Sequence, residues 1–291
     1  RQKALAECIE SIFDCSHQSS LLEVIVIDNN STDGTLGFLK GLADEDPRLR
    51  FTRILERNAI KARNLGFGLA SGDIAIHIDD DVIVDKEWLW NLVAPYVDES
   101  VGGVGGRLVN FGQASETIPR HMVGRISPWG QFVTNFDAQK MREVEFLHGS
   151  NMSFRRDLVM RAKGLDPSYK MNWRDDTDLC IRIRRLGYRL LYQPTALVWH
   201  KGLGSNTRFT SANKLYRYFW NREYFYYKNI FSLKRLPWSP IFTWSETMFC
   251  MVLCARQSMT RHLGECLQSI KEGTIAGLRR NINRSGNFAD S

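Results

Sequence analysis

The sequence predicts an α/β fold, Rossmann-like, in which helices flank a mostly parallel sheet and a helical region follows at the C-terminal end. Short apolar runs alternate with amphipathic segments through the first part of the chain. Acidic clusters follow two of these apolar runs, and the composition becomes aromatic and basic near the end. We therefore expect one domain over residues 1–205 and a helical C-terminal region over residues 206–291.

The alternation of strand and helix patterns is regular up to about residue 109. A helical stripe of apolar residues lies at 2–15, and a continuous apolar run at 24–27 is typical of a strand covered on both faces. The remaining helix patterns are at 35–43, 59–70 and 86–96, and the strand patterns at 51–55, 73–78 and 101–109. An α/β domain usually leads into its first helix with a strand, so the N-terminus looks truncated.

The middle of the chain is less regular. Residues 112–145 show no clear period, and ordered patterns return at 146–156, at 176–186 as a helix before Gly187, and at 188–200 as a strand. These segments complete the first predicted domain.

Composition limits the possible partners and the compartment. The net charge of +7 leaves two interpretations open, a solvated basic surface or attraction to an acidic partner such as a nucleotide diphosphate or anionic lipid. No Cys/His finger and no RNP-like strand is present, which argues against a nucleic-acid partner. The six cysteines form no CxxC pair and no metal-finger spacing, which favours a reducing, cytoplasmic compartment.

Carboxylates follow two of the predicted strands. Asp28 ends the first apolar run, and Asp79, Asp80 and Asp81 follow the strand at 73–78. Ligands bind at the carboxyl ends of strands in open α/β sheets, and we expect both groups at the same edge of one sheet. Three adjacent acids repel one another unless a cation or a donor lies among them. The sequence therefore predicts a site for Mg²⁺ or Mn²⁺, with solvated acidic turns as the alternative.

Two later features have a structural and a functional interpretation. Asp175 and Asp176 precede a helical pattern, where acids stabilise a helix start by about 0.3–1 kcal/mol. One of them could instead be a general base. His200 closes an apolar strand pattern, where it is either a structural residue or a nitrogen ligand of the predicted cation.

Four segments together resemble glycosyltransferase family 2, of the bacterial cell-envelope type, whose members have the GT-A fold. They are VIVIDNNSTDGT (24–35), RNAIKARNLGFGLASGDIAIHIDDDVIVDKEWL (57–89), FLHGSNMSFRR (146–156) and DDTDLCIRIRRLGYRLLYQPTALVWHKG (175–202). The resemblance spans residues 24–202, in the order and spacing of the family. It departs from the family before residue 1, where a first strand ending in a Pro-Thr-Tyr-Asn-like motif is expected.

The resemblance implies a role for each matching residue. The nucleotide-sugar site would consist of Asp28, Asn30, Asp33, Arg63, Asp79 and Asp80. The metal ligands would be Asp81, His200 and Asp79, in a DxD motif that binds Mn²⁺ or Mg²⁺. The acceptor and sugar site would include Gly149, Asn151, Trp173 and Asp175, with Asp176 as the catalytic base. Asp175 stands where the family usually has Glu, so its side chain is shorter.

The resemblance also implies a reaction. We expect inverting transfer of a sugar from a UDP, dTDP or GDP donor to a hydroxyl of a glycan or lipid-linked acceptor in cell-envelope polysaccharide synthesis. The chain as given, without a first strand, is expected to be less stable and to bind its donor more weakly than a longer version. Two alternatives remain: a catalytically impaired relative that binds nucleotide or a partner protein, and a sugar-phosphate nucleotidyltransferase.

The C-terminal region allows two arrangements. Aromatic residues crowd the stretch 216–227 beside Lys214, Arg217, Arg222 and Lys228, a composition that suits a membrane interface. The apolar stretch 238–255 is too short and too polar to span a bilayer, because Glu246 lies near its middle. The region either packs as an ordinary helical appendage or rests peripherally on the inner face of the plasma membrane.

Overall fold

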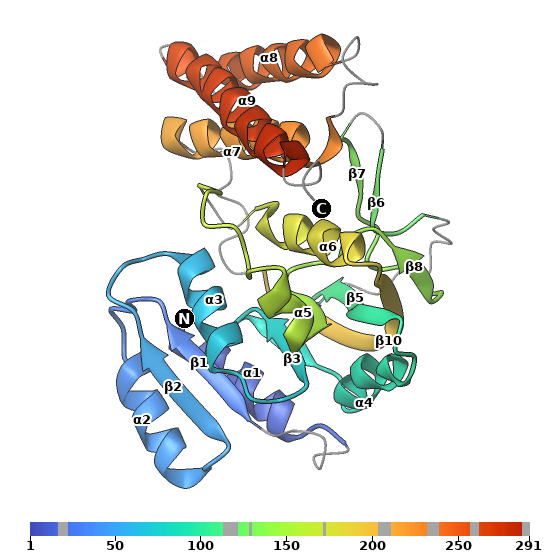
Figure 1. Cartoon of the computed structure of the whole chain (residues 1–291). Coiled ribbons are helices and arrows are strands. Elements are labelled where there is room, and N and C mark those ends of the chain that lie inside the picture. Colours follow the sequence, from blue (N-terminus) through green and yellow to red (C-terminus); the bar gives the residue numbers. More distant parts are fainter. Residues whose placement is uncertain are drawn as a thin grey trace. The chain divides into compact units, whose positions relative to one another are not determined.

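The computed structural model describes residues 1–16, 23–112, 122–127, 130–170, 173–202, 211–231, 239–256 and 262–286 (Figure 1). The chain divides into two compact units. The first unit consists of Arg1–Arg125, Val133–Asp166 and Leu179–Leu203, and the second of Ile126–Phe132, Pro167–Asp178 and Gly204–Ser291. The long segment of the second unit thus begins close to the boundary expected at residue 205, and two shorter segments join it.

The N-terminal part of the first unit alternates helices and strands as the sequence predicts. Its elements are α1 (Gln2–Phe13), β1 (Val24–Asp28), α2 (Thr35–Glu45), β2 (Leu49–Arg53), α3 (Ala59–Leu69), β3 (Ile74–Ile78), β4 (Val82–Val84), α4 (Trp88–Val93), the 3₁₀ turn η2 (Ala94–Val97) and β5 (Val101–Asn110). The apolar stripe of α1 is buried, which explains why this segment is helical. Helix α3 begins at a polar cap, because the Asn58 side chain accepts from the backbone N–H of Lys61. Helix α2 follows Gly34, and the Asp33 side chain before it accepts from the backbone N–H of Thr35.

The later elements complete the fold. They are the short strands β6 (Arg125–Ile126), β7 (Phe132–Val133) and β8 (Arg142–Val144), then β9 (Asn151–Arg155), α5 (Arg156–Arg161), α6 (Asp175–Arg185) and β10 (Arg189–His200). Part of the irregular stretch 112–145 lies outside the described residues. The strand pattern at 188–200 and the helix pattern at 176–186 match β10 and α6 closely.

The strands form one large mixed sheet and two small sheets. The large sheet has the order β3-β9-β5-β10-β4, with β8 also paired to β10. Its β5–β10 pairing is parallel, and β9, β4 and β8 join in antiparallel directions. A separate parallel pair is formed by β1 and β2, and β6 pairs with β7. The α/β class with helices around a central sheet is therefore confirmed.

One expectation about this sheet is wrong. Asp28 ends β1 and the acidic triplet follows β3, but within the described residues these strands belong to different hydrogen-bonded sheets. The physical reason is that β1 pairs only with β2, and β3 pairs only with β9, among the strands that the structure describes. The two acidic groups therefore do not share the edge of one continuous sheet.

A bulge in β10 fixes the direction of its last residues. The register with β5 shifts between Gln193 and Leu197, around Pro194, which has no N–H to donate to a ladder. The carbonyl oxygen of Ala196 at this shift accepts a hydrogen bond from the Asn151 side chain at 3.0 Å. A Cβ added to Gly106 of β5 would lie 2.1 Å from the same oxygen, so this close approach requires glycine.

Helices dominate the second unit. They are α7 (Ala212–Phe225), continued by the π-helical turn η4 (Tyr226–Ile230), then α8 (Ser239–Arg256) and α9 (Leu263–Gly286) (Figure 1). Helix α9 packs along α7 so closely that a Cβ on Gly273 would lie 2.6 Å from the carbonyl oxygen of Trp220. A Cβ on Gly277 would lie 2.7 Å from the carbonyl oxygen of Tyr224. Glycine at these two positions allows the backbones to approach.

The aromatic residues of the 216–227 stretch pack mostly inward in the second unit. Most of them are buried, namely Tyr218, Phe219, Trp220, Tyr224, Phe225, Tyr226 and Tyr227. The carboxylate of Glu246 is also buried, and it pairs with the partly exposed guanidinium of Arg222. These residues form the core of a packed helical unit. Among the described residues, no helix combines the length and the apolar character that a bilayer crossing requires.

Candidate active site

Three side chains with metal-ligand chemistry meet where β3 and β10 end. Asp79, Asp81 and His200 each offer a ligand atom, and these atoms lie within 4.8 Å of one another. The Nε2 atom of His200 lies 3.3 Å from a carboxylate oxygen of Asp81 and 3.8 Å from one of Asp79. The strands bring them together, because the backbone N–H of Lys201 donates to the carbonyl of Asp81 at 2.9 Å.

The ionisation of this group is strongly coupled. Hydrogen bonds to Asp79 and Asp81 raise the pKa of His200 to about 9. Burial works against ionisation of Asp79, yet hydrogen bonds from His200 and Ser150 and the charge of His77 hold its pKa below the usual range. The Ser150 hydroxyl donates to Asp79 at 2.5 Å. Without another cation, the imidazole therefore carries positive charge between the carboxylates.

Asp80 lies beside this cluster and has a different environment. Burial raises the pKa of Asp80, the guanidinium of Arg1 lowers it, and the neighbouring carboxylates raise it further. The Arg1 guanidinium lies 2.6 Å from Asp80 and 3.2 Å from Asp81. Positive groups thus already compensate the acidic triplet. Two carboxylate oxygens and one imidazole nitrogen make a donor set that suits Mn²⁺ or Mg²⁺.

The loop after β1 places the residues expected to hold the nucleotide. Asp28 is buried, one of its oxygens accepts from the N–H of Ser31 at 2.9 Å, and the other lies 3.2 Å from the Arg53 guanidinium. Asn30 has a left-handed backbone, with φ of 58°. Its side chain accepts from Arg53 and donates to the Leu55 carbonyl. Arg53 links Asp28 to Asn30, and sequence reasoning missed this link because Arg53 lies in a strand without a motif.

Asp33 and Arg63 occupy positions with clear structural roles. Asp33 accepts from both the N–H and the hydroxyl of Thr35 at the start of α2, so its carboxylate is engaged in the turn that leads into this helix. These bonds hold the pKa of Asp33 well below its usual range. Arg63 lies in α3, and its positive charge lowers the pKa of Asp79. Arg63 therefore belongs to the electrostatic surroundings of the metal-type cluster.

The loop before β9 contributes backbone and support. The carbonyl oxygen of Gly149 accepts from Nδ1 of His77 at 2.7 Å. Asn151 is fully buried, and its side chain accepts from Trp88 and donates to the carbonyls of Ala196 and Arg107. Any part that Asn151 has in a sugar site is therefore indirect, since its polar atoms hold the strands together. Ser150, which lies between Gly149 and Asn151, donates its hydroxyl to Asp79. Sequence reasoning did not name Ser150, although its position in the HGSN segment could have indicated a role at the site.

The remaining predicted residues lie in the second unit. Trp173 stacks on Tyr218 with ring centroids 4.3 Å apart. The guanidinium carbon of Arg174 lies 4.3 Å from the centroid of the Trp173 ring. Asp175 is buried at the first turn of α6. Asp176 is partly exposed, and its carboxylate accepts from the N–H of Thr177 at 2.6 Å. This carboxylate therefore combines exposure with a stabilised helix start, as a base on this helix requires.

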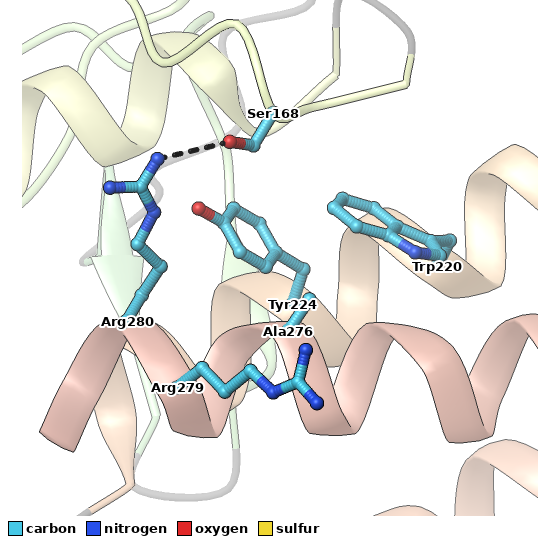
Figure 2. A pocket seen from close by; sticks show the side chains of 6 residues that line it. All are labelled: Ser168, Trp220, Tyr224, Ala276, Arg279 and Arg280. Atoms are coloured by element: carbon cyan, nitrogen blue, oxygen red, sulfur yellow. Dashed lines mark hydrogen bonds between the residues drawn. The ribbon is translucent and has the colours of Figure 1, made fainter. Parts of the chain in front are cut away.

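The second unit also contains a pocket of about 320 Å³ (Figure 2). It is lined by Ser168, Trp220, Tyr224, Ala276, Arg279 and Arg280. The Arg280 guanidinium donates to the Ser168 hydroxyl at 3.4 Å, and both arginines are exposed. Trp220 and Tyr224 stack with centroids 4.7 Å apart and form the pocket's aromatic wall. Two guanidinium groups over an aromatic wall suit a small anionic group.

The α/β fold and the acidic cluster with its histidine define a protein of the GT-A class. The chain belongs to glycosyl transferase family 2, whose model matches residues 1–162. Probable glycosyltransferase YdaM of Bacillus subtilis (strain 168) is 24% identical over 204 residues, which cover 68% of this chain and 47% of YdaM. The chain therefore spans about half the length of that relative.

Other relatives and solved structures agree with this assignment. Glucosyl-dolichyl phosphate glucuronosyltransferase of Haloferax volcanii is 28% identical over 229 residues, with 76% of this chain and 71% of the relative covered. Mannosyltransferase PcManGT from Pyrobaculum calidifontis, in complex with GDP-Man and Mn²⁺, superposes with a TM-score of 0.59 at 18% identity, over 97% of this chain and 84% of the other. The structure of GalNAc-T7 with UDP, GalNAc and Mn²⁺ superposes with a TM-score of 0.60 at 17% identity, over 90% of this chain and 56% of the other. These structural likenesses show the fold.

Proposed function

We propose that this protein transfers a sugar from a nucleotide-diphosphate donor to an acceptor hydroxyl, with inversion at the anomeric carbon. The observation that carries the proposal is the convergence of Asp79, Asp81 and His200. Such a set would hold Mn²⁺ or Mg²⁺ against the donor diphosphate. The names of two structural neighbours, which mention GDP-Man or UDP together with Mn²⁺, support this choice of ligand.

The chemistry would be a single displacement. Asp176 takes the proton of the acceptor hydroxyl, and the acceptor oxygen forms its bond to the anomeric carbon as the bond to the diphosphate oxygen breaks. The diphosphate leaves with the electron pair of the broken bond. A bound cation would supply charge neutralisation at this leaving group. Asp28 would contact the base, with Asn30 in the supporting turn. Asp79 would lie near the ribose, and Arg63 would add positive charge near the diphosphate.

The acceptor is proposed to be a glycan or lipid-linked sugar of the cell envelope. The pocket lined by Arg279 and Arg280 supports a phosphate-bearing acceptor, because an exposed guanidinium group can donate to phosphate oxygens. The Haloferax relative is named for a dolichyl phosphate sugar, which is an acceptor of this chemical kind.

We also propose that the protein works at the inner face of the plasma membrane, and the support comes from α8. Its outer face carries a stripe of exposed apolar residues at helical spacing: Ile241, Trp244, Met248, Phe249 and Val252. Trp244 is 66% exposed, unlike the buried aromatic residues of α7. Flotation with vesicles tests this proposal. Equal recovery of wild type and Trp244→Ala with anionic vesicles at low salt would contradict it.

A thermal-shift panel tests the donor site. The protein is mixed with UDP, GDP or dTDP, each with and without Mn²⁺ or Mg²⁺, and wild type is compared with Asp81→Ala. Asp157→Ala is the matched control, since this exposed acid pairs with Arg161 one turn away on the same helix. We expect one diphosphate to raise the melting temperature, only with metal, in wild type and control but not in Asp81→Ala. Stabilisation without turnover would favour an impaired relative, and release of diphosphate from nucleoside triphosphate and sugar phosphate would favour a nucleotidyltransferase.

A further inference from the structure

Three cysteines of the second unit converge on one point. Cys250 and Cys254 lie one turn apart on α8, so both sulfurs are on the same face of the helix. Cys266 faces them from α9, which packs against α8. The three sulfur atoms lie within 4.8 Å of one another, and each of the three residues is completely buried. The scattered spacing in the sequence gave no sign of this cluster.

The buried cysteines of the first unit bond to the backbone and provide a comparison for the cluster. The sulfur of Cys8 donates to a backbone carbonyl, as does that of Cys15, and the sulfur of Cys180 accepts from a backbone N–H. Each therefore behaves as a small apolar residue whose sulfur bonds to the backbone. The second unit differs, because the sulfur atoms of Cys250, Cys254 and Cys266 have one another as neighbours. Three thiols arranged around one point have the geometry of a ligand set.

The distances fit a tetrahedral thiophilic ion. Zinc binds thiolate sulfur at about 2.3 Å, which places two sulfurs of one ion roughly 3.8 Å apart. Sulfurs already within 4.8 Å of one another need only small rotamer adjustments to reach that spacing. We propose that Cys250, Cys254 and Cys266 form a second metal site that binds a soft divalent ion such as Zn²⁺ through three thiolates.

The two metal-type sites differ in ligand chemistry. Carboxylate and imidazole donors at Asp79, Asp81 and His200 suit a hard ion such as Mg²⁺ or Mn²⁺, whereas thiolates select zinc and other soft ions. Binding at the cysteine site removes the proton of each thiol to solvent, so affinity falls as pH falls. Because the cluster joins α8 to α9, the ion would fasten these two helices in the apolar core that they share with Leu215, Phe219 and Ile270.

Titration with Cd²⁺ tests this site, because cadmium thiolates absorb in the ultraviolet while carboxylate complexes do not. The reduced protein is stripped with a chelator and then titrated. We expect one equivalent of Cd²⁺ to produce the thiolate band in wild type, and Zn²⁺ to displace it. In Cys266→Ala the affinity should fall at least about tenfold. Cys15→Ala, a buried isolated thiol, is the matched control and should behave as wild type.

A further comparison separates this site from the proposed donor site. Asp81→Ala should keep the cadmium thiolate band, whatever its effect on nucleotide binding. A wild type without the band, or an unchanged Cd²⁺ affinity in Cys266→Ala, would overturn the proposal. If the cysteine variants do not fold, X-ray absorption of zinc-loaded wild type decides the question. A sulfur shell at about 2.3 Å supports the site, and a shell of only oxygen and nitrogen overturns it.

Discussion

The imidazole Nε2 of His200 lies 3.3 Å from a carboxylate oxygen of Asp81, although the two residues are far apart in sequence. The backbone reinforces this pairing, because the N–H of Lys201 donates to the carbonyl of Asp81. His200 also stands opposite Val82 in the β10–β4 register. The acidic turn and the end of β10 are thus fastened to each other by main-chain bonds, which keep the side chains in place when charges change.

Removing either residue should weaken cation binding. We expect Asp81→Ala and His200→Ala each to lower the affinity for Mn²⁺, measured by calorimetry in the presence of the preferred diphosphate, by at least roughly 10- to 100-fold. The exposed acid variant Asp157→Ala should match wild type. Unchanged Mn²⁺ affinity in both site variants would remove the cluster from the proposed donor site.

The raised pKa of His200 predicts a pH dependence of stability in the metal-free protein. The folded-state pKa of about 9 lies above the unfolded value of 6.5, so the folded state holds the proton more tightly. Protonation of His200 therefore stabilises the folded state by at most about 3 kcal/mol. This contribution is complete below pH 6.5 and is lost as the pH rises through 9. Urea unfolding with chelator, on either side of this window, measures it. His200→Gln should remove that part of the dependence, and an identical pH profile in the variant would contradict the assignment.

Replacing Asp176 with Asn should separate catalysis from donor binding. Loss of a general base typically lowers the rate by about 10²- to 10⁴-fold, while the amide keeps the shape of the carboxylate. We expect kcat to fall by that amount in a sugar-transfer assay and the diphosphate-induced thermal shift to remain. Asp157→Asn serves as the control. Near-normal turnover by Asp176→Asn would assign the base to another residue.

The arginine pocket predicts an effect on the acceptor alone. Arg279→Gln and Arg280→Gln each remove one positive charge from the pocket wall. We expect the KM for a phosphate-bearing acceptor to rise about tenfold, with the KM for the donor unchanged. An acceptor without phosphate should be used equally well by variants and wild type. A change in the donor KM, or no change for either acceptor, would contradict the phosphate-binding role.

The contact between α7 and α9 predicts opposite effects for two glycine substitutions in one helix. A Cβ at Gly277 would lie 2.7 Å from the carbonyl oxygen of Tyr224, so Gly277→Ala should lower the free energy of unfolding by about 1–3 kcal/mol. A Cβ at Gly264 has nothing within 4 Å, so Gly264→Ala should be neutral or stabilising. Denaturant unfolding measures both. Equal effects would mean that the helices do not approach as closely as described.

The elements that could be predicted from sequence were those whose pattern is local. The apolar stripe of α1 and the acids that follow β3 are visible in a short window, because helix and strand periods are written in consecutive residues. The antiparallel strands β4, β8 and β9 were not predicted, because pairing direction depends on residues far apart in sequence. The separation of β1 from β3 into different sheets was missed for the same reason.

In the candidate site, the sequence predicted which residues belong to the site but not the contacts that surround them. Asp79, Asp81 and His200 were named from sequence and the structure brings them together, but the bond from Ser150 to Asp79 was not foreseen. The buried position of Asn151 was not foreseen either, because its partners are backbone carbonyls that have no sequence signature. Burial of the aromatic residues in α7 also depended on a packing partner, α9, which composition alone could not place.

The bulge in β10 isolates the histidine that ends the strand from changes in chain length. The residues 194–196 lie between consecutive partners on β5, and His200 follows four positions after Ala196. Residues 197–200 pair one by one with β5, and His200 also pairs with β4, so the bulge can absorb a one-residue deletion within 194–196 without turning His200. A one-residue deletion within 197–199 would instead turn His200 to the opposite face of the sheet. The paired end of β10 therefore tolerates no change of length, whereas the bulge does.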